Sequence, residues 1–364
     1  MEQRLQVDTI YTAILLAKFK RIGASEKLTQ WLRSYLTGRV ICVKMGSSTS
    51  LCFTNSSGVP QGSNIGPTLF LLSFNDVTIL LGAGCNLVYA DDLKLFIVVR
   101  SIEDCYRLQE LVDIFVNWCK RNFMTVSVAK CSVISFHRKA NPLLFNYSMD
   151  GIALARVDQV RDLGVVLDTR LSFSLHYSSI IAKANRQLGF ITKIASDFND
   201  PHCLRSLYCS LVRPILETAA VVWTPYQLSW SLRIERVQRR FVRFALRRLP
   251  WRDDQSLTPY HERCRLLNLE TLDRRRKIAQ ATFVAKILNG EIDSSHLLSN
   301  LCLRTPARTL QNQNLLQPLF HRTVYGYNEP LTSLIRTFST VEELFDFNEP
   351  TRKFTCRLSR STQL

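Results

Sequence analysis

Short apolar and polar runs alternate over the first 170 residues, with glycine, proline and serine between them. Residues 9–12 have the composition of a short strand, and the apolar spacing of residues 13–21 is helical up to the breaker Gly23. Ser25 stands where a helix N-cap belongs, ahead of a second helical pattern that continues to Leu36. These patterns predict an α+β arrangement for this part of the chain.

Hairpin and turn signals continue this mixed pattern. RVICVKM and SLCFT predict two strands that turn back at Gly46-Ser47-Ser48. GVPQGS, residues 58–63, has the composition of a turn, and Pro67 after it suits the first turn of a helix. The further predicted elements are the continuation of that helix through Leu72, an amphipathic helix near Ile102–Cys119, the strand CSVISF, and a hairpin that turns at Asp150-Gly151.

Strand patterns fade after Asp168, and helical patterns replace them. Four helices are predicted at Ser174–Ala195, His202–Val222, Ser231–Leu249 and Thr271–Leu288. The sequence after Glu291 has a weaker pattern, with stretches that are rich in Asn and Gln or interrupted by Pro. We therefore predict an α+β domain at residues 1–170, a helical region at 171–290, and a weakly structured or small helical tail at 291–364.

Two adjacent carboxylates, Asp91 and Asp92, interrupt the strand-forming stretch NLVYADDLKLFIVV. The flanking apolar runs predict a hairpin with the carboxylates at its tip. Two ionised carboxylates in contact repel each other, and a divalent cation removes that conflict. Mg²⁺ prefers one or two carboxylates together with substrate phosphates, as in polymerases. The alternative interpretation is a solvent-exposed acidic turn.

The charge balance favours a polyanionic partner. The chain of 364 residues carries 47 Lys and Arg against 30 Asp and Glu, a net charge of +17. Such an excess is typical of proteins that bind nucleic acid, although a soluble basic enzyme is the alternative. Hydrophobic residues make up 46% of the chain, which is enough for a packed core and excludes a disordered tail.

The cysteine pattern predicts neither a metal knuckle nor a disulfide framework. Eleven cysteines are scattered without a CxxC pair, and His261 with Cys264 has no second pair nearby. This usage favours a reducing compartment, nuclear or cytoplasmic. No secretory leader follows Met1, and no apolar run approaches the ~18 residues of a membrane span. We expect neither secretion nor a membrane partner.

The predicted helix Ser231–Leu249 separates apolar from basic positions. Its apolar stripe consists of Ile234, Val237, Phe241 and Phe244. Arginines recur on another face at spacings of 4, 3 and 4 residues, namely Arg236, Arg240, Arg243 and Arg247. Such a face can follow a nucleic-acid backbone through forked donors to phosphate, and a solvated surface is the alternative. The tryptophans Trp118, Trp223, Trp230 and Trp251 are expected in the core.

Four stretches in this order resemble reverse transcriptases. YADD at Tyr89–Asp92 looks like the catalytic box, and GVPQGSNIGPTLFLLSFND resembles the box that positions template and primer. NWCKRNFMTVSVAKCSVISF is similar to the box that carries a functional lysine, and DGIALARVDQVRDLGVVLD looks like the primer-grip hairpin. SLVRPILE and the helix IERVQRRFVRFAL resemble the region after the palm in LINE-type retrotransposons without long terminal repeats, in particular the jockey-like group.

The resemblance implies an RNA-directed DNA polymerase, a nucleotidyltransferase that copies retrotransposon RNA with two Mg²⁺, with Mn²⁺ as a possible substitute. Its fold would be an antiparallel palm sheet backed by helices, followed by a helical thumb. RNA template and DNA primer would be its partners, with no small-molecule cofactor beyond nucleotides. The implied roles are metal binding by Asp91 and Asp92, proton donation or charge stabilisation by Lys130, contact with template and nucleotide by Pro60, Gln61 and Gly62, and shaping of the primer end by Tyr89 and Ala90. A solvated lysine and a loop-structuring amide are the alternatives for Lys130 and Gln61.

The sequence departs from the family at its first catalytic box. The family places a third carboxylate on an upstream strand, in a box that reads roughly aromatic-x-Asp-x-x-x-Ala-Phe-Asp. Here VDTIYT runs from Thr12 directly into Ala13, and the helix AILLAKFKRIG follows. Asp8 is the acid nearest to the junction, but it precedes the family's catalytic position. The resemblance also implies that the upstream fingers are missing, so we expect this chain to be impaired as an enzyme.

Two functions from different classes therefore compete. The first is the RNA-directed DNA polymerase, impaired by loss of the upstream carboxylate. The second is a catalytically inactive retrotransposon remnant that only binds RNA or an RNA–DNA hybrid. A nuclease or a cyclase with paired aspartates explains neither residues 58–76 nor the Arg-rich helix. The presence or absence of a third carboxylate at the site discriminates between the polymerase and the inactive remnant.

Overall fold

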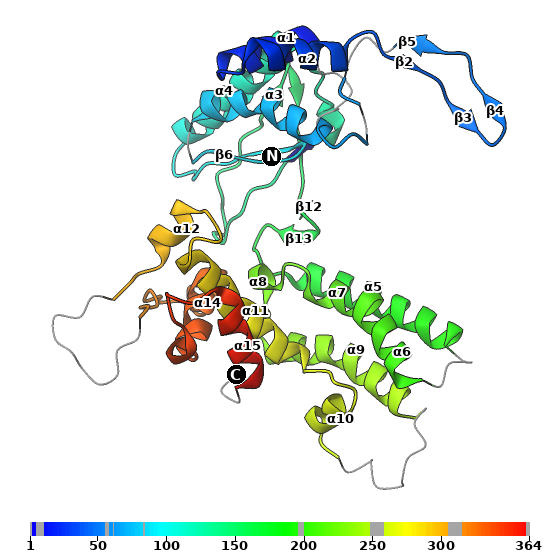
Figure 1. The fold of residues 1–364 in the computed structure, drawn as a ribbon. Helices are drawn as coiled ribbons and strands as arrows, with labels where there is room; N and C mark the ends of the chain where they lie inside the picture. Colours follow the sequence, from blue (N-terminus) through cyan, green and yellow to red (C-terminus); the bar gives the residue numbers. More distant parts are fainter. Residues whose placement is uncertain are drawn as a thin grey trace. The chain divides into compact units, whose positions relative to one another are not determined.

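A computed structural model describes residues 2–4, 11–54, 58–60, 62–82, 84–195, 200–247, 258–304 and 315–361. The chain divides into two compact units, Met1–Ser172 and Phe173–Leu364. The first unit combines strands with helices, and the second is built from helices (Figure 1). This architecture confirms the predicted α+β class.

A five-stranded sheet organises the first unit. Its strand order is β11-β8-β1-β7-β6, with antiparallel pairs except for the parallel pair β11-β8. The strands are β1 (Glu2–Arg4), β6 (Asn86–Tyr89), β7 (Asp92–Leu95), β8 (Ser132–Val133) and β11 (Ala155–Arg156). The predicted hairpin is present as β6 and β7, and it lies at the edge of the sheet because β6 is an edge strand.

Four helices pack against this sheet (Figure 1). They are α1 (Thr12–Arg21), α2 (Glu26–Leu36), α3 (Gly66–Leu81) and α4 (Ile102–Arg121). Because side chains alternate along a strand, Leu93 and Leu95 of β7 point into the same core, where Phe74 of α3 and Phe115 of α4 are also buried. The Phe74 ring meets Trp118 edge to face, with 5.2 Å between centroids.

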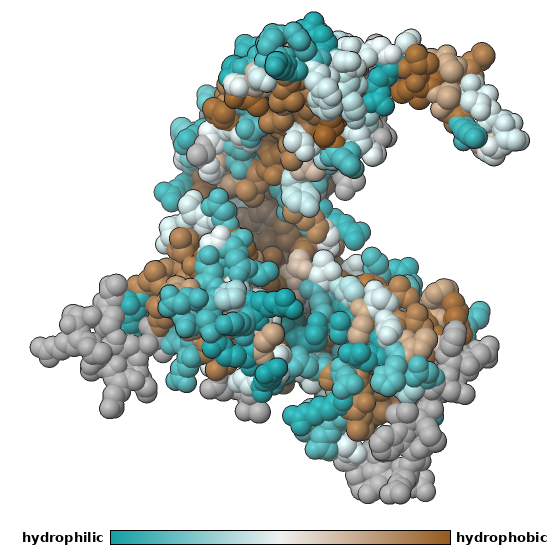
Figure 2. All heavy atoms as spheres, in the orientation of Figure 1, coloured by the Kyte–Doolittle hydropathy of each residue, from teal (hydrophilic) through white to brown (hydrophobic). Residues whose placement is uncertain are grey.

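Four two-stranded sheets complete the first unit. They pair β2 (Val40–Ile41) with β5 (Phe53–Thr54), β3 (Lys44–Met45) with β4 (Ser48–Thr49), β9 (Ser148–Met149) with β10 (Ile152–Ala153), and β12 (Gln159–Asp162) with β13 (Val165–Asp168). β2 to β5 form one long hairpin that projects from the helices, and Figure 2 shows apolar side chains on it. The predicted turns at residues 46–48 and at Asp150-Gly151 are confirmed, although Ser48 already belongs to β4.

Local signals located several helices correctly. The Ser25 hydroxyl accepts a hydrogen bond from the backbone N–H of Leu28 at 3.3 Å and caps α2, as predicted. The helix after Pro67 extends beyond Leu72 to Leu81. The predicted strand at residues 9–12 is wrong at Thr12, which begins α1, and residues 9 and 10 lie outside the described part. The strand CSVISF is shorter than expected, because only Ser132 and Val133 are in β8.

The second unit consists of helices and connecting segments. They are α5 (Ser174–Ile194), α6 (Pro201–Leu207), α7 (Arg213–Glu217), α8 (Ala220–Trp223), α9 (Leu228–Leu246), α10 (Tyr260–Leu266), α11 (Leu272–Leu288), α12 (Ser295–Asn300), α13 (Val324–Tyr327), α14 (Pro330–Ser339) and α15 (Thr351–Arg360). α9 packs against α5, and α11 packs against α14 and α15. A second core includes Leu334, Phe338 and Phe354.

The predicted helix His202–Val222 is wrong as a single element. A π-helical turn at Tyr208–Val212 separates α6 from α7, and Ala219 has a φ of 55° before α8. Pro214 lacks a backbone N–H and its ring crowds the preceding turn, which accounts for the widened hydrogen-bond pattern. The tryptophans Trp118 and Trp223 are buried as expected, Trp230 is half-buried, and Trp251 lies outside the described residues.

Candidate functional site

The two aspartates lie at a two-residue turn between β6 and β7. Tyr89 and Asp92 are paired across the hairpin, which leaves Ala90 and Asp91 as the turn residues. Ala90 has a φ of 52°, in the left-handed region that a residue with a Cβ rarely adopts. Strain of this kind persists only where surrounding structure holds it, and it occurs often at functional sites.

The hairpin presents one apolar and one polar face. Val88 and Leu93 are opposite each other and face the core, whereas Tyr89 and Asp92 share the other face. Tyr89 is 64% exposed, but Asp92 is only 8% exposed. Lys94 lies on the same face as Asp92, and its ammonium pairs with the Asp162 carboxylate of β12.

A cavity of about 740 Å³ brings the hairpin turn and the segment around Pro60 together. Two distant stretches of sequence supply its walls. The predicted site residues that line it are Pro60, Gly62, Tyr89, Ala90 and Asp91. The apolar wall comes from Val59, Phe70, Leu71 and Val88. Gln61 lies outside the described residues.

Hydrogen bonds join the segment around Pro60 to the start of α3. The Ser63 hydroxyl donates to the Pro60 carbonyl at 2.7 Å and accepts from the backbone N–H of Gly66 at 3.0 Å. A Cβ on Gly66 would lie 2.9 Å from the Ser63 oxygen and 3.1 Å from the Pro60 carbonyl oxygen. Gly62 has a φ of 76°, which is accessible to glycine at little cost. The two glycines therefore permit this path of the backbone along the cavity.

A buried polar cluster connects α1, α3 and α4 behind this segment. The Lys18 ammonium lies 2.9 Å from the Asp76 carboxylate and donates to the Ser73 carbonyl at 2.5 Å. The indole N–H of Trp118 donates to the same Asp76 carboxylate at 3.2 Å. Burial lowers the pKa of Lys18, and the hydrogen bond to Asp76 opposes that shift. Asp76 is the last residue of the stretch that begins at Gly58, so this cluster anchors the helix that follows the cavity segment.

Lys130 lies at the same end of the sheet as the aspartates. Glu2 of β1 pairs with both Lys94 and Ser132, and Arg4 pairs with Asp92. Lys130 itself ends a 3-10 turn, Val128–Lys130, that contacts β1 just before β8 begins. Lys130 is exposed, and it is not among the described residues that line the cavity.

The donor set at the turn fits a divalent cation in part. Carboxylate oxygens are the ligands that Mg²⁺ prefers, and Asp91 is half-buried at the cavity wall with Asp92 beside it. Within the described ranges, no group of three or more His, Cys, Asp and Glu side chains is positioned to hold a metal ion. Asp8 lies outside those ranges. Two carboxylates can hold one cation, but a bridged metal pair needs a further ligand.

The four arginines of the predicted basic face are exposed on α9. Arg236, Arg240, Arg243 and Arg247 all point away from the core, and Arg239 is exposed beside them. The Arg240 guanidinium donates to the Asn185 side chain of α5 at 2.8 Å. This surface belongs to the second unit, whereas the cavity belongs to the first.

The single acid of α9 does not neutralise this basic face, because it is buried. Glu235 is 5% exposed and accepts hydrogen bonds from the Tyr260 hydroxyl at 2.6 Å and from the backbone N–H groups of Leu272 and Asp273 at 3.1 and 3.2 Å. Its carboxylate therefore caps the N-terminus of α11. In the sequence, Glu235 is one acid among arginines, and nothing near it indicates that it contacts Tyr260 and the start of α11.

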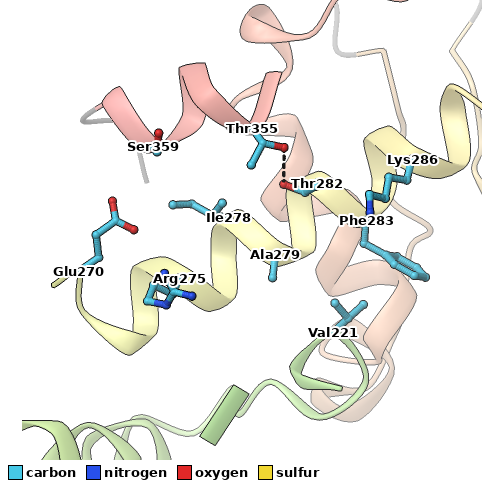
Figure 3. A pocket seen from close by; sticks show the side chains of 10 residues that line it. All are labelled: Val221, Glu270, Arg275, Ile278, Ala279, Thr282, Phe283, Lys286, Thr355 and Ser359. Atoms are coloured by element: carbon cyan, nitrogen blue, oxygen red, sulfur yellow. Dashed lines mark hydrogen bonds between the residues drawn. The ribbon is translucent and has the colours of Figure 1, made fainter. Parts of the chain in front are cut away.

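The second unit has a hollow of its own, of about 480 Å³, between α11 and α15 (Figure 3). Arg275 at its wall pairs with Glu217, and the hydroxyls of Thr282 and Thr355 lie 3.3 Å apart across it. None of the site residues predicted from the sequence lines this hollow. Of the two cations that α11 places at this hollow, Arg275 is paired with Glu217 and Lys286 is the other, and no carboxylate pair like that of the first unit lies among the described residues that line it.

No helix in the described part of the chain combines the length and apolar character needed to cross a bilayer.

Comparisons with known proteins find similarity over the part of the chain that contains this cavity. Residues 7–167 match the family described as Reverse transcriptase (RNA-dependent DNA polymerase). Over 248 residues the chain is 28% identical to the "Probable RNA-directed DNA polymerase from transposon BS" of Drosophila melanogaster, covering 65% of this chain and 27% of the relative. It is 29% identical over 205 residues to the "RNA-directed DNA polymerase from mobile element jockey" of Drosophila funebris, covering 52% of this chain and 22% of the relative. The chain thus spans about a quarter of the length of these relatives.

Proposed function

Because residues 7–167 match the reverse transcriptase family, we propose that the chain is an RNA-directed DNA polymerase module of a jockey-like retrotransposon whose own activity is impaired. The observation that carries the proposal is the 740 Å³ cavity where Pro60, Gly62 and the turn residues Ala90 and Asp91 meet. Residues that resemble the family's template-positioning and catalytic boxes both line this cavity, which supports a shared site.

The residue roles that we propose are those implied by the resemblance, and the cavity brings several of these residues together. Asp91 would hold Mg²⁺, with Mn²⁺ as a substitute, and Asp92 would assist from the adjacent strand position. Pro60 and Gly62 would contact template and nucleotide through a closely approaching backbone, together with Gln61. The exposed Tyr89 ring would support the primer end. Lys130 would act toward the pyrophosphate at the same end of the sheet. The metal, when bound, supplies positive charge at the attacking and leaving oxygens.

The proposed impairment rests on the number of carboxylates. Phosphoryl transfer of this kind depends on positioning and on charge stabilisation of the developing oxyanion. Asp91 and Asp92 are the two acids at the turn, and the sequence lacks the family's upstream box between Thr12 and Ala13. With only two ligands, a pair of cations would bind weakly or in the wrong geometry. An RNA-binding remnant without catalysis is the second candidate, favoured by the exposed arginines of α9.

A primer-extension assay tests the proposal. The chain as it stands would be compared with a version that carries a family-type box restored between Thr12 and Ala13, each with and without Asp91→Asn, in Mg²⁺ and in Mn²⁺. We expect extension only from the restored chain with Asp91 intact. Matched circular dichroism spectra would show that the variants remain folded.

Robust extension by the unrestored chain would contradict the impairment, because another residue, most simply Asp8, would then complete the site. If the restored chain binds an RNA–DNA hybrid but extends nothing, the second candidate is favoured. Sequencing the genomic DNA across the codons for Thr12 and Ala13 would show whether a segment that encodes the box was skipped.

A further inference from the structure

The outer face of α2 carries an exposed aromatic stack. Trp31 is 53% exposed, and its ring lies parallel to that of Tyr35, with 5.6 Å between centroids and 8° between planes. The Arg39 guanidinium continues the series, 5.3 Å from the centroid of the Tyr35 ring. Three planar groups at intervals of four residues thus follow one another along a single surface.

The Trp31 ring does not serve the core of its unit, although Tyr35 packs partly against that core. The inward side of α2 is occupied by Thr29, Leu32 and Leu36, which are 1%, 2% and 6% exposed. Tryptophan buries a large apolar area when it is used for packing, so a half-exposed Trp31 forgoes much of that stabilisation. A role in binding accounts for a tryptophan ring that is held parallel to its neighbour and remains open to solvent.

The charge around the stack specifies the kind of partner. Residues 11–54 contain seven Lys and Arg and one acid, Glu26. The Glu26 carboxylate lies 2.9 Å from the ammonium of Lys20, so it does not oppose an approaching anion. A cationic surface with open aromatic faces complements a flexible polyanion that carries planar rings. Unpaired nucleotides have both properties, whereas a duplex hides its base faces.

We propose that Trp31, Tyr35 and Arg39 form a stacking platform for single-stranded nucleic acid. A base would stack on the exposed Trp31 ring, which Tyr35 and Arg39 hold in place from behind, and phosphates would lie along the cations of residues 11–54. Stacking on aromatic side chains tolerates any base, so the platform would bind RNA with little sequence preference. The proposal deepens the proposed function, on which it rests, by assigning unpaired template to this helix, away from the cavity.

Fluorescence anisotropy with labelled oligo(U), oligo(A) and an RNA–DNA hybrid duplex tests the platform, without metal or nucleotide. We expect Trp31→Ala to weaken binding of both single strands about tenfold, the usual effect of losing one stacking partner, and that of the duplex by less than twofold. Trp31→Phe should retain most of the affinity. Tyr226→Ala removes a ring with the same exposure, 52%, from the second unit and serves as the matched control.

Unchanged single-strand affinity in Trp31→Ala would overturn the platform, and so would an equal loss for single strand and duplex, because that pattern indicates a general electrostatic effect. If the same protein still binds the hybrid, only the platform fails and the proposed function stands. If the unmodified chain binds neither ligand, both fail. The platform would also be overturned if Trp31→Ala abolished the capture of a protein partner by the chain while RNA affinity stayed unchanged.

Discussion

Removal of the Glu235 carboxylate should destabilise the second unit more than the loss of any exposed charge on the same helix. The carboxylate receives three hydrogen bonds, from the Tyr260 hydroxyl and from the first two N–H groups of α11. Glu235 is 5% exposed, so water cannot replace the carboxylate without rearrangement. Glu235→Ala would leave three donors unsatisfied in the interior.

The magnitude follows from these contacts. Each orphaned buried donor costs about 1–3 kcal/mol, and the charge at a helix N-terminus contributes up to about 2 kcal/mol in partly buried geometries. Since such effects are not fully additive, we expect Glu235→Ala to lower the free energy of unfolding by about 3–5 kcal/mol. Glu235→Gln keeps one acceptor oxygen and should cost about half as much.

Chemical denaturation followed by circular dichroism measures this effect, with Glu291→Ala as an exposed acidic control that should change stability by less than about 0.5 kcal/mol. The slope of the transition should stay the same, because the surface exposed on unfolding is unchanged. If the free energy of unfolding of Glu235→Ala lies within about 0.5 kcal/mol of that of the unmodified chain, the carboxylate does not cap α11 and our interpretation of the helix junction is wrong.

Four further predictions concern other parts of the chain. Asp76→Asn should lower the free energy of unfolding by about 1–2 kcal/mol in denaturant, because it leaves the partly buried Lys18 ammonium without its carboxylate. Replacing the lysine by methionine should cost less. Arg240→Ala with Arg243→Ala should reduce the slope of log affinity against log salt by up to about two for RNA, and an unchanged slope would remove the basic face from nucleic-acid binding. Ala90→Gly should raise the melting temperature, since glycine relieves about 1 kcal/mol of left-handed strain; a lower melting temperature would show that the turn is not strained. Burial raises the pKa of Glu342 above its usual 4.5, so its ionised form opposes folding and the penalty grows as pH rises through that value; Glu342→Gln should therefore gain stability relative to the unmodified chain at pH 7 but not at pH 3, by thermal unfolding.

Local chemistry explains which elements the sequence could predict. The cap at Ser25 and the turn at Asp150-Gly151 depend on neighbouring residues, and both were located correctly. β1 was missed because Glu2–Arg4 has no apolar alternation, and its partners Lys94 and Ser132 are far away in the sequence. The apolar spacing of residues 202–222 is that of one continuous helix. It therefore did not predict the π-helical turn at Tyr208–Val212, which lies next to Pro214.

The sequence also predicted some contacts of the functional residues and not others. The resemblance to a family connected Pro60 with Asp91, and the structure lines one cavity with both. Their catalytic roles remain predictions. The cap formed by Glu235 could not be read from the sequence, since spacing within α9 carries no information about the start of α11. The sequence therefore failed mainly to predict which distant groups the charged residues contact.

The position of β1 in the middle of the main sheet has a consequence for how the two units reach their native state. β1 lies between β7 and β8, so it joins the pair β6-β7 to the pair β8-β11, and its residue Glu2 lies opposite both Lys94 and Ser132. Closing such long loops costs entropy before any pairing compensates, whereas successive helices of the second unit meet over shorter separations. Assembly of the first unit is therefore the slow step, and until β1 inserts, the edges of β7 and β8 present open backbone groups to other chains.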